Sequence, residues 1–141
     1  MGRLLAIDYG AKRVGLAVTD PLKMIATALD TVHAQDTIQY LLDYTQKEEV
    51  EAFVLGMPKN LNNTDTHATG LAREFAKILA KKIPDIPIHL HDERFTSKIA
   101  LDAMIAGGTS KKYRQNKANI DKVSAVIILQ SYLESQGGGN Y

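Results

Sequence analysis

The sequence predicts an α/β fold, a mixed five-stranded sheet with helices on both faces. Three short apolar runs separated by tight turns open the chain, which predicts three antiparallel strands in succession. Each later apolar run follows a stretch with helical spacing, so its strand should join the sheet parallel to the first. The 141 residues, of which 45% are hydrophobic, suffice for one domain, which we expect to span residues 1–141 with a flexible tail at 136–141.

The leading strands are predicted from apolar runs bounded by turn residues. Leu4–Ile7 is apolar throughout and ends in Asp8-Tyr9-Gly10, which is typical of a strand buried on both faces. Val14–Thr19 follows after a short turn and completes an antiparallel hairpin. A third strand is expected at Ala28–His33, after the Asp20-Pro21 break. Together these three strands form a meander.

The remaining elements alternate between helical and extended spacing. The first is a helix capped by Asp36, with Ile38, Leu41, Leu42 and Thr45 on one face, and it is followed by a strand at Glu51–Leu55 that is stopped by Gly56-Met57-Pro58. Next come a helix that starts at Asp65 or Thr66 and is ended by Pro84, and a strand at Ile86–Leu90. The last two elements are a helix from Thr96 or Ser97 to Ala106, and a helix opened by Asp121 with a stripe of Val123, Val126, Ile127, Gln130 and Leu133. Open α/β sheets bind ligands beyond the carboxyl ends of their parallel strands, which directs attention to Asp8, Gly56–Asn60 and His91–Arg94.

The composition excludes several classes of protein. The chain has no cysteine, which excludes a disulfide framework, thiolate catalysis and cysteine-ligated metals, and favours a reducing compartment. No apolar run approaches the ~18–20 residues of a membrane span. The first acid already occurs at Asp8, so the N-terminus does not resemble a signal peptide. We therefore expect a cytoplasmic protein, a monomer or weak homodimer, that does not bind membranes.

The charges are unevenly distributed although the formal net charge is only +1. Residues 98–122 carry six bases and two acids, whereas residues 30–52 carry six acids and one base. A basic segment of this kind is typical of a nucleic-acid-binding surface, and a solvated surface loop is the alternative. The residues that we expect to contact nucleic acid are Lys12, Arg13, Lys59, Asn60, Arg94, Lys111, Lys112, Arg114 and Lys117. The amide-rich loop around Asn60 could bind oxygens of the nucleic-acid backbone, but its spacing is explained slightly better by a turn-rich connector without a binding role.

Three acidic positions fall at the ends of elements that the fold should bring together. Asp8 ends the first strand, Asp92-Glu93 ends the fifth, and Asp121 begins the last helix. A lone carboxylate at the edge of a core is costly unless a cation pairs with it. Two Mg²⁺ or Mn²⁺ ions would offset this cost and would clamp a scissile phosphate. The alternative to a metal-binding role is structural: Asp121 could cap its helix, and Asp92 or Glu93 could form an ion pair with Arg94. The spacing does not show which of the neighbours Asp92 and Glu93 would bind the metal.

The histidines and aromatic residues give weaker indications. His89 and His91 share one face of their predicted strand, but the four histidines show no metal-ligand spacing that fits their elements. Tyr9 lies beside the first acid and is a candidate for stacking on nucleobases.

Four motifs, in order along the chain, resemble those of the YqgF/RuvX family: Asp8 to Ala17, Gly56-Met57-Pro58-Lys59-Asn60, Asp92-Glu93-Arg94-Phe95-Thr96-Ser97, and Ile120-Asp121-Lys122 followed by Ala125 to Leu133. Members are described as Holliday junction resolvases and as nucleases that mature the 5′ end of pre-16S rRNA. The resemblance covers essentially the whole chain and implies a ribonuclease-H-like fold. It also implies that Asp8, Glu93 and Asp121 are the acidic active-site residues, with Asp92 outside the ligand set.

The leading hypothesis is therefore a metal-dependent endonuclease in which Asp8, Glu93 and Asp121 hold two Mg²⁺ or Mn²⁺ ions. Pre-16S rRNA is preferred over a four-way DNA junction, because a resolvase should be a dimer and nothing in the sequence indicates a dimer surface. An ATP-binding module and a non-catalytic nucleic-acid-binding protein are the other hypotheses. The former needs two such domains, and the chain supplies one.

Overall fold

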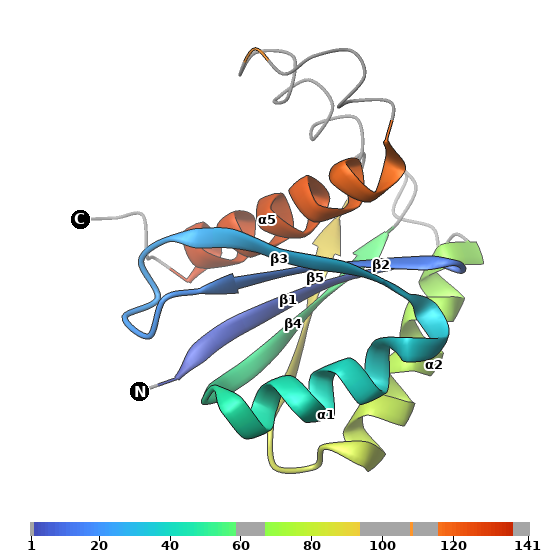
Figure 1. Cartoon of the computed structure of the whole chain (residues 1–141), viewed down its shortest axis with the longest axis horizontal. Helices are drawn as coiled ribbons and strands as arrows, with labels where there is room; N and C mark the ends of the chain where they lie inside the picture. The colour runs from blue at the N-terminus through green and yellow to red at the C-terminus, as the bar shows by residue number, and fades with distance from the viewer. Residues whose placement is uncertain (1, 59–66, 94–107, 109–115, 137–141) are drawn as a thin grey trace.

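The computed structural model describes residues 2–58, 67–93, 108 and 116–136, with the backbone alone at Pro58, His67, Ala68, Glu93, Lys117 and Ala118. Five strands form one sheet in the order β3-β2-β1-β4-β5 (Figure 1). They are β1 (Arg3–Tyr9), β2 (Arg13–Thr19), β3 (Ala26–His33), β4 (Val50–Pro58) and β5 (Ile88–Glu93). The β1–β2 and β2–β3 pairs are antiparallel, and the β1–β4 and β4–β5 pairs are parallel. The predicted mixed sheet is confirmed.

Helices cover both faces of this sheet, as the sequence predicted (Figure 1). On one face lie α1 (Thr37–Lys47) and α2 (His67–Lys82), and a short 3-10 turn, η1 (Ala34–Asp36), leads from β3 into α1. On the other face lies α5 (Lys117–Ser135), which contacts β1, β2 and β3. Among the described residues, none of the helices combines the length and hydropathy that crossing a membrane requires.

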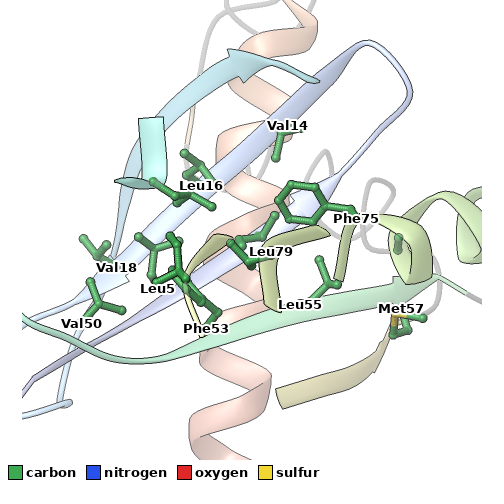
Figure 2. Packing of buried hydrophobic residues seen from close by; sticks show 14 residues of the cluster. Leu5, Val14, Leu16, Val18, Val50, Phe53, Leu55, Met57, Phe75 and Leu79 are labelled. Carbon is green, nitrogen blue, oxygen red and sulfur yellow. The ribbon is translucent and has the colours of Figure 1, made fainter. Parts of the chain in front are cut away.

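The face beneath α1 and α2 is packed with large apolar side chains (Figure 2). Leu5, Phe53 and Leu55 from the sheet are fully buried and form one cluster with Leu79 of α2. Burying such a side chain contributes about 1.5–3 kcal/mol, so this face supplies a large share of the folding free energy. The Tyr9 ring belongs to the same face, where it stacks on Phe75 with the ring centroids 4.4 Å apart. It therefore packs against the core, where the sequence had suggested a role in base stacking.

The face beneath α5 combines a group of alanines with the larger side chains of Leu4, Val54, Ile128 and Leu129. Ala6, Ala17 and Ala52 come from three neighbouring strands and pack in one cluster with Ala125 of α5. Small residues allow the backbone of a helix to approach a sheet closely. This packing sets the position of the first turns of α5, on which part of the candidate site depends.

The largest differences from the predicted strand boundaries occur in β4 and β5. The predicted stop after Leu55 is wrong, because β4 continues to Pro58 and its last three residues pair with the last three of β5. β5 itself runs from Ile88 to Glu93, two to three residues later than expected. Cross-strand pairing thus overrides the turn signal of glycine followed by proline, and both strands reach the same edge of the sheet.

The first helix begins where the sequence predicts, with Asp36 at its N-cap, whereas the start predicted for the last helix is wrong. The Asp36 side chain makes no capping hydrogen bond to α1; instead, the Thr37 hydroxyl donates to the His33 carbonyl at 3.0 Å. The last helix begins at Lys117, so Asp121 lies in its second turn and cannot be an N-cap. The alternative that explained Asp121 as a helix cap is therefore removed.

The orientation of α5 also differs from the predicted one. Its fully buried residues are Ser124, Ala125, Ile128 and Leu129. The expected stripe around Val126 and Ile127 is only partly buried, and Gln130 is exposed. Apolar residues occur all around this helix, so their spacing could not identify the buried side.

Some expected features lie outside the described residues. These are the helix from Thr96 or Ser97 to Ala106, the first residues of the helix expected from Asp65 or Thr66, and residues 137–141 of the expected tail. The span of the domain, 1–141, stays a prediction.

Candidate active site

The carboxyl ends of the three parallel strands meet at one edge of the sheet. β1 ends just past Asp8, β4 ends at Pro58, and the backbone of Glu93 at the end of β5 is in register with Pro58. The strand order places β4 alone between β1 and β5. The backbone therefore carries Asp8 and Glu93 to the same edge, as the rule for open α/β sheets predicted.

Asp121 is brought to this edge by a close backbone contact. Gly15 of β2 pairs with Asp8 of β1, and a Cβ atom added to Gly15 would overlap the backbone carbonyl of Asp121. Paired residues on antiparallel strands lie about 4.5–5.5 Å apart at their Cα atoms. Asp8 and Asp121 are therefore neighbours in space, since both lie next to Gly15. Only glycine can occupy this position without displacing α5.

An ion pair links Arg13 to Asp121. The Arg13 Nε donates to the Asp121 Oδ2 at 2.8 Å, with 37% of the arginine side chain and 21% of the aspartate side chain exposed. Hydrogen bonds between ionised groups are about twice as strong as those between neutral groups. The guanidinium that was expected to contact phosphate thus neutralises one of the predicted acidic residues in this structure.

The turn between β1 and β2 presents a second base. Lys12 is exposed, and its backbone carbonyl accepts a hydrogen bond from the Ala34 N–H at 2.9 Å. Together with Arg13, His33 and Gln35 it lines an open hollow of about 420 Å³. Two of the predicted nucleic-acid contacts, Lys12 and Arg13, therefore lie next to the candidate site.

A buried hydroxyl follows Asp121 on α5. Ser124 is one turn later in the helix, and its Oγ is fully enclosed and has no hydrogen-bond partner among the residues that the structure describes. An unsatisfied buried hydroxyl costs about 1–3 kcal/mol, a cost that a bound water or ligand would offset. The sequence reasoning missed both this serine and Gly15, although a glycine inside a strand is itself a sign of close backbone approach.

The two histidines of β5 lie on the α5 side of the sheet. The His91 Nε2 is 2.9 Å from the Ser131 Oγ, and the rings of His89 and His91 both contact Tyr132. Burial lowers the pKa of His91, while the neighbouring Asp92 carboxylate opposes this shift. The lowered pKa favours a neutral imidazole at neutral pH.

Asp92 lies on the opposite side of β5. With Met57, Arg73 and Leu90 it lines a small hollow on the α2 side of the sheet. Side chains alternate between the two faces along a strand, in agreement with His89 and His91 on the α5 side. Asp92 therefore lies on the side of the sheet away from Asp121.

Parts of the predicted site lie outside the described residues. Among the side chains that the structure describes, no three of the types His, Cys, Asp or Glu are grouped closely enough to hold a metal ion. The side chains of Asp8 and Asp121 are among those described, but that of Glu93 is not. A metal site formed by Asp8, Glu93 and Asp121 therefore stays a prediction. The predicted contacts at Lys59, Asn60, Arg94, Lys111, Lys112 and Arg114 lie outside the described residues, as does the side chain of Lys117.

Comparison with known proteins identifies the family. The family model described as "RuvX: Holliday junction resolvase" matches residues 2–135. The chain belongs to the RuvX family. A relative from Amoebophilus asiaticus, named "Putative pre-16S rRNA nuclease", is 52% identical over 135 residues, which cover 96% of each protein. A relative of the same name from Phocaeicola vulgatus is 52% identical over 136 residues, 96% of this chain and 98% of that protein.

A solved structure supports the architecture of this RuvX member. The chain is similar to T. thermophilus RuvC in complex with a Holliday junction substrate, with a TM-score of 0.53, 16% identity and 97% of both chains covered. This similarity concerns the fold, and it confirms the predicted ribonuclease-H-like architecture. The names of the RuvX relatives describe nucleases, so the predicted enzyme class, a hydrolase acting on ester bonds, is confirmed.

Proposed function

We propose that the chain is a divalent-metal-dependent endonuclease that hydrolyses phosphodiester bonds of structured RNA and processes the 5′ end of pre-16S rRNA in the cytoplasm. The observation that carries this proposal is the meeting of Asp8 and Asp121 across Gly15, at the edge where β5 ends. The substrate is supported by the relatives that are named for it at 52% identity. We further propose that the chain is one domain that acts as a monomer or weak homodimer.

The residues at this edge fit a divalent cation. Carboxylate oxygens are the ligands that Mg²⁺ and Mn²⁺ prefer. The Ser124 Oγ, one turn after Asp121, has no hydrogen-bond partner in the described part of the chain and supplies a further polar atom that a bound water could satisfy. Asp8, Glu93 and Asp121 would hold the ions, two Mg²⁺ or Mn²⁺. The chemistry supplied by the bound ions is a nucleophile at neutral pH and neutralisation of the charge that develops on the leaving oxygen.

The bases of the β1–β2 turn have two roles in this proposal. Arg13 balances the charge of Asp121 when no metal is bound, and it becomes available to a phosphate oxygen once Asp121 has another cation. The exposed Lys12 offers a second positive charge beside it. Lys59, Asn60, Arg94 and the segment from Lys111 to Lys117 would hold the rest of the RNA backbone by charge, which positions the strand without reading its sequence.

The decisive experiment is cleavage by an Asp8→Asn variant. An RNA that contains the 5′ precursor end of 16S rRNA is incubated with Mg²⁺ or Mn²⁺, and the rate of cleavage is measured. We expect a loss of roughly 100-fold or more, because a displaced metal removes several kcal/mol of transition-state stabilisation. Asp92→Asn is the matched control and should cleave at nearly the wild-type rate, since it alters the adjacent acid on the α2 side.

The other outcomes assign the protein differently. If Asp8→Asn cleaves as fast as the wild type, the acid has no part in the mechanism. If the wild-type protein binds the RNA but cleaves it with neither metal, the chain is a non-catalytic nucleic-acid-binding protein. Micromolar binding of ATP in a calorimeter would instead favour the nucleotide-binding hypothesis.

A four-way DNA junction is the second candidate substrate. The description of the family as Holliday junction resolvases favours it. A resolvase must cut two strands symmetrically, so this function requires a dimer. The same variants are therefore assayed on a four-way junction, and the oligomeric state is measured by light scattering. Paired, symmetric cuts by a dimeric protein would favour the junction over the RNA.

A further inference from the structure

A groove lies between α5 and the sheet, away from the acidic edge. Its volume is about 290 Å³. Leu4 and Ala52 of the sheet form part of its lining, together with His89 of β5 and Tyr132 and Leu133 of α5. Lys23, Glu51 and Gln136 complete the lining, so the groove combines an aromatic and aliphatic part with a polar part.

Two rings line this groove, His89 and Tyr132, and a third, His91, packs against Tyr132. The centroids of His89 and Tyr132 are 5.7 Å apart at an interplanar angle of 41°, and those of His91 and Tyr132 are 5.9 Å apart at 83°. The hydrogen-bond contact of 2.9 Å between the His91 Nε2 and the Ser131 Oγ holds the second histidine against α5. His89 is exposed and Tyr132 is partly exposed, so the cluster is ordered by its own contacts and open to solvent.

Among the described residues that line the groove, the one cation is already engaged. Lys23 is part of its wall, and its Nζ donates to both carboxylate oxygens of Glu51 at 2.7 and 2.8 Å. This pairing lowers the pKa of Glu51, which keeps the carboxylate charged. The groove therefore offers aromatic surface rather than free positive charge, which suits the flat, uncharged face of a base better than a phosphate group.

β5 connects the groove with the proposed catalytic edge. His89 and His91 lie on the α5 side of the strand, and the strand ends two residues later at Glu93. At about 3.3 Å per residue, the distance from His89 to Glu93 along the strand is roughly 13 Å. A nucleic-acid strand with its scissile phosphate at the acidic edge could therefore place a nearby base over His89 and Tyr132.

We propose that this groove binds an unpaired base of the substrate strand by stacking on Tyr132 and His89. The inference rests on the proposed nuclease function, since it names a substrate contact of the same site. Aromatic side chains bind bases with little sequence preference, because every base presents a π face. The groove therefore selects for a substrate with single-stranded nucleotides close to the cleavage site, whatever their identity.

The test is a fluorescence titration in EDTA, where no hydrolysis occurs. A single-stranded RNA oligonucleotide carries the fluorescent base 2-aminopurine at one position, and the position is moved along a series of oligonucleotides. In wild-type protein we expect quenching at one or two adjacent positions. Tyr132→Leu, which keeps an apolar side chain but removes the ring, should abolish the quenching, whereas Tyr132→Phe, which keeps a ring, should retain it. His89→Ala should raise the Kd by about 5-fold or more, since stacking on one aromatic side chain changes affinity by roughly 5- to 150-fold.

Leu90→Ala is the matched control, because Leu90 lies between the two histidines but on the α2 side and is 56% exposed. The inference is overturned if no oligonucleotide shows position-dependent quenching, if Tyr132→Leu and His89→Ala bind as the wild type does, or if Leu90→Ala has the same effect. This readout is independent of the cleavage assay. If Asp8→Asn cleaves as fast as the wild type and quenching is still observed, the proposed function is rejected, while base binding in the groove is supported.

Discussion

The two faces of the sheet are packed against their helices in different ways. Beneath α1 and α2, side chains such as Phe53 and Leu55 are fully buried in one large apolar cluster. Beneath α5, alanines meet Ala125, and Gly15 has no side chain at all where the Asp121 carbonyl approaches it. The Arg13–Asp121 ion pair belongs to the α5 face, as does the buried Ser124 hydroxyl, which has no hydrogen-bond partner among the described residues.

This difference indicates that one face mainly contributes stability and the other mainly positions the site. Large side chains bury more apolar area and give more stability, but they keep a helix at a distance from the sheet. Small side chains give less stability and let the helix backbone approach the strands. The α5 face thus loses packing energy, and in exchange it brings two distant acids, Asp8 and Asp121, close together.

The largest expected effect on stability comes from the α1 and α2 face. Phe53→Ala removes a fully buried ring from the centre of that cluster and should lower the free energy of unfolding by about 3–5 kcal/mol. Urea-induced unfolding measures this loss. The cleavage rate, corrected for the folded fraction, should stay near that of the wild type. A larger fall in corrected activity than in stability would show that the two faces are not independent.

An intermediate effect is expected from Gly15→Ala on the α5 face. The new Cβ would overlap the Asp121 carbonyl, so α5 must shift, at a cost of about 1–3 kcal/mol. Because the shift moves Asp121 away from Asp8, cleavage should fall more than the folded fraction does, the opposite of the Phe53 result. Rates and urea unfolding curves of the same preparations provide the comparison.

Gly70→Ala is the control for this substitution. Gly70 is exposed on α2, and an added Cβ has no atom within 4 Å. Alanine is favoured over glycine inside a helix by about 0.5–1 kcal/mol, so this variant should be slightly more stable and equally active. Equal losses of activity in the two glycine variants would contradict the close-approach argument.

The elements that could be predicted from sequence are those specified by local pattern. The apolar run Leu4–Ile7 and the hairpin after it are specified by their own residues, and the edge rule then located Asp8 and the end of β5. The buried side of α5 could not be predicted, because its apolar residues surround the helix. Nor could the pairing of Arg13 with Asp121, which are 108 residues apart, because it depends on how closely α5 approaches β2.

The smallest effect, and the sharpest test of the α5 face, concerns Arg13. Its guanidinium and a metal ion compete for the same Asp121 carboxylate, so Arg13→Gln should tighten binding of Mn²⁺, measured by titration calorimetry, by about two- to tenfold. The gain is modest because the pair is partly exposed and solvent weakens it. Lys12→Gln removes the same charge from the adjacent, exposed position and should leave the Kd for Mn²⁺ nearly unchanged. If Arg13→Gln weakens Mn²⁺ binding and Lys12→Gln does not, Arg13 organises the site instead of competing for it, and Asp121 needs the arginine to stay in place beside Gly15.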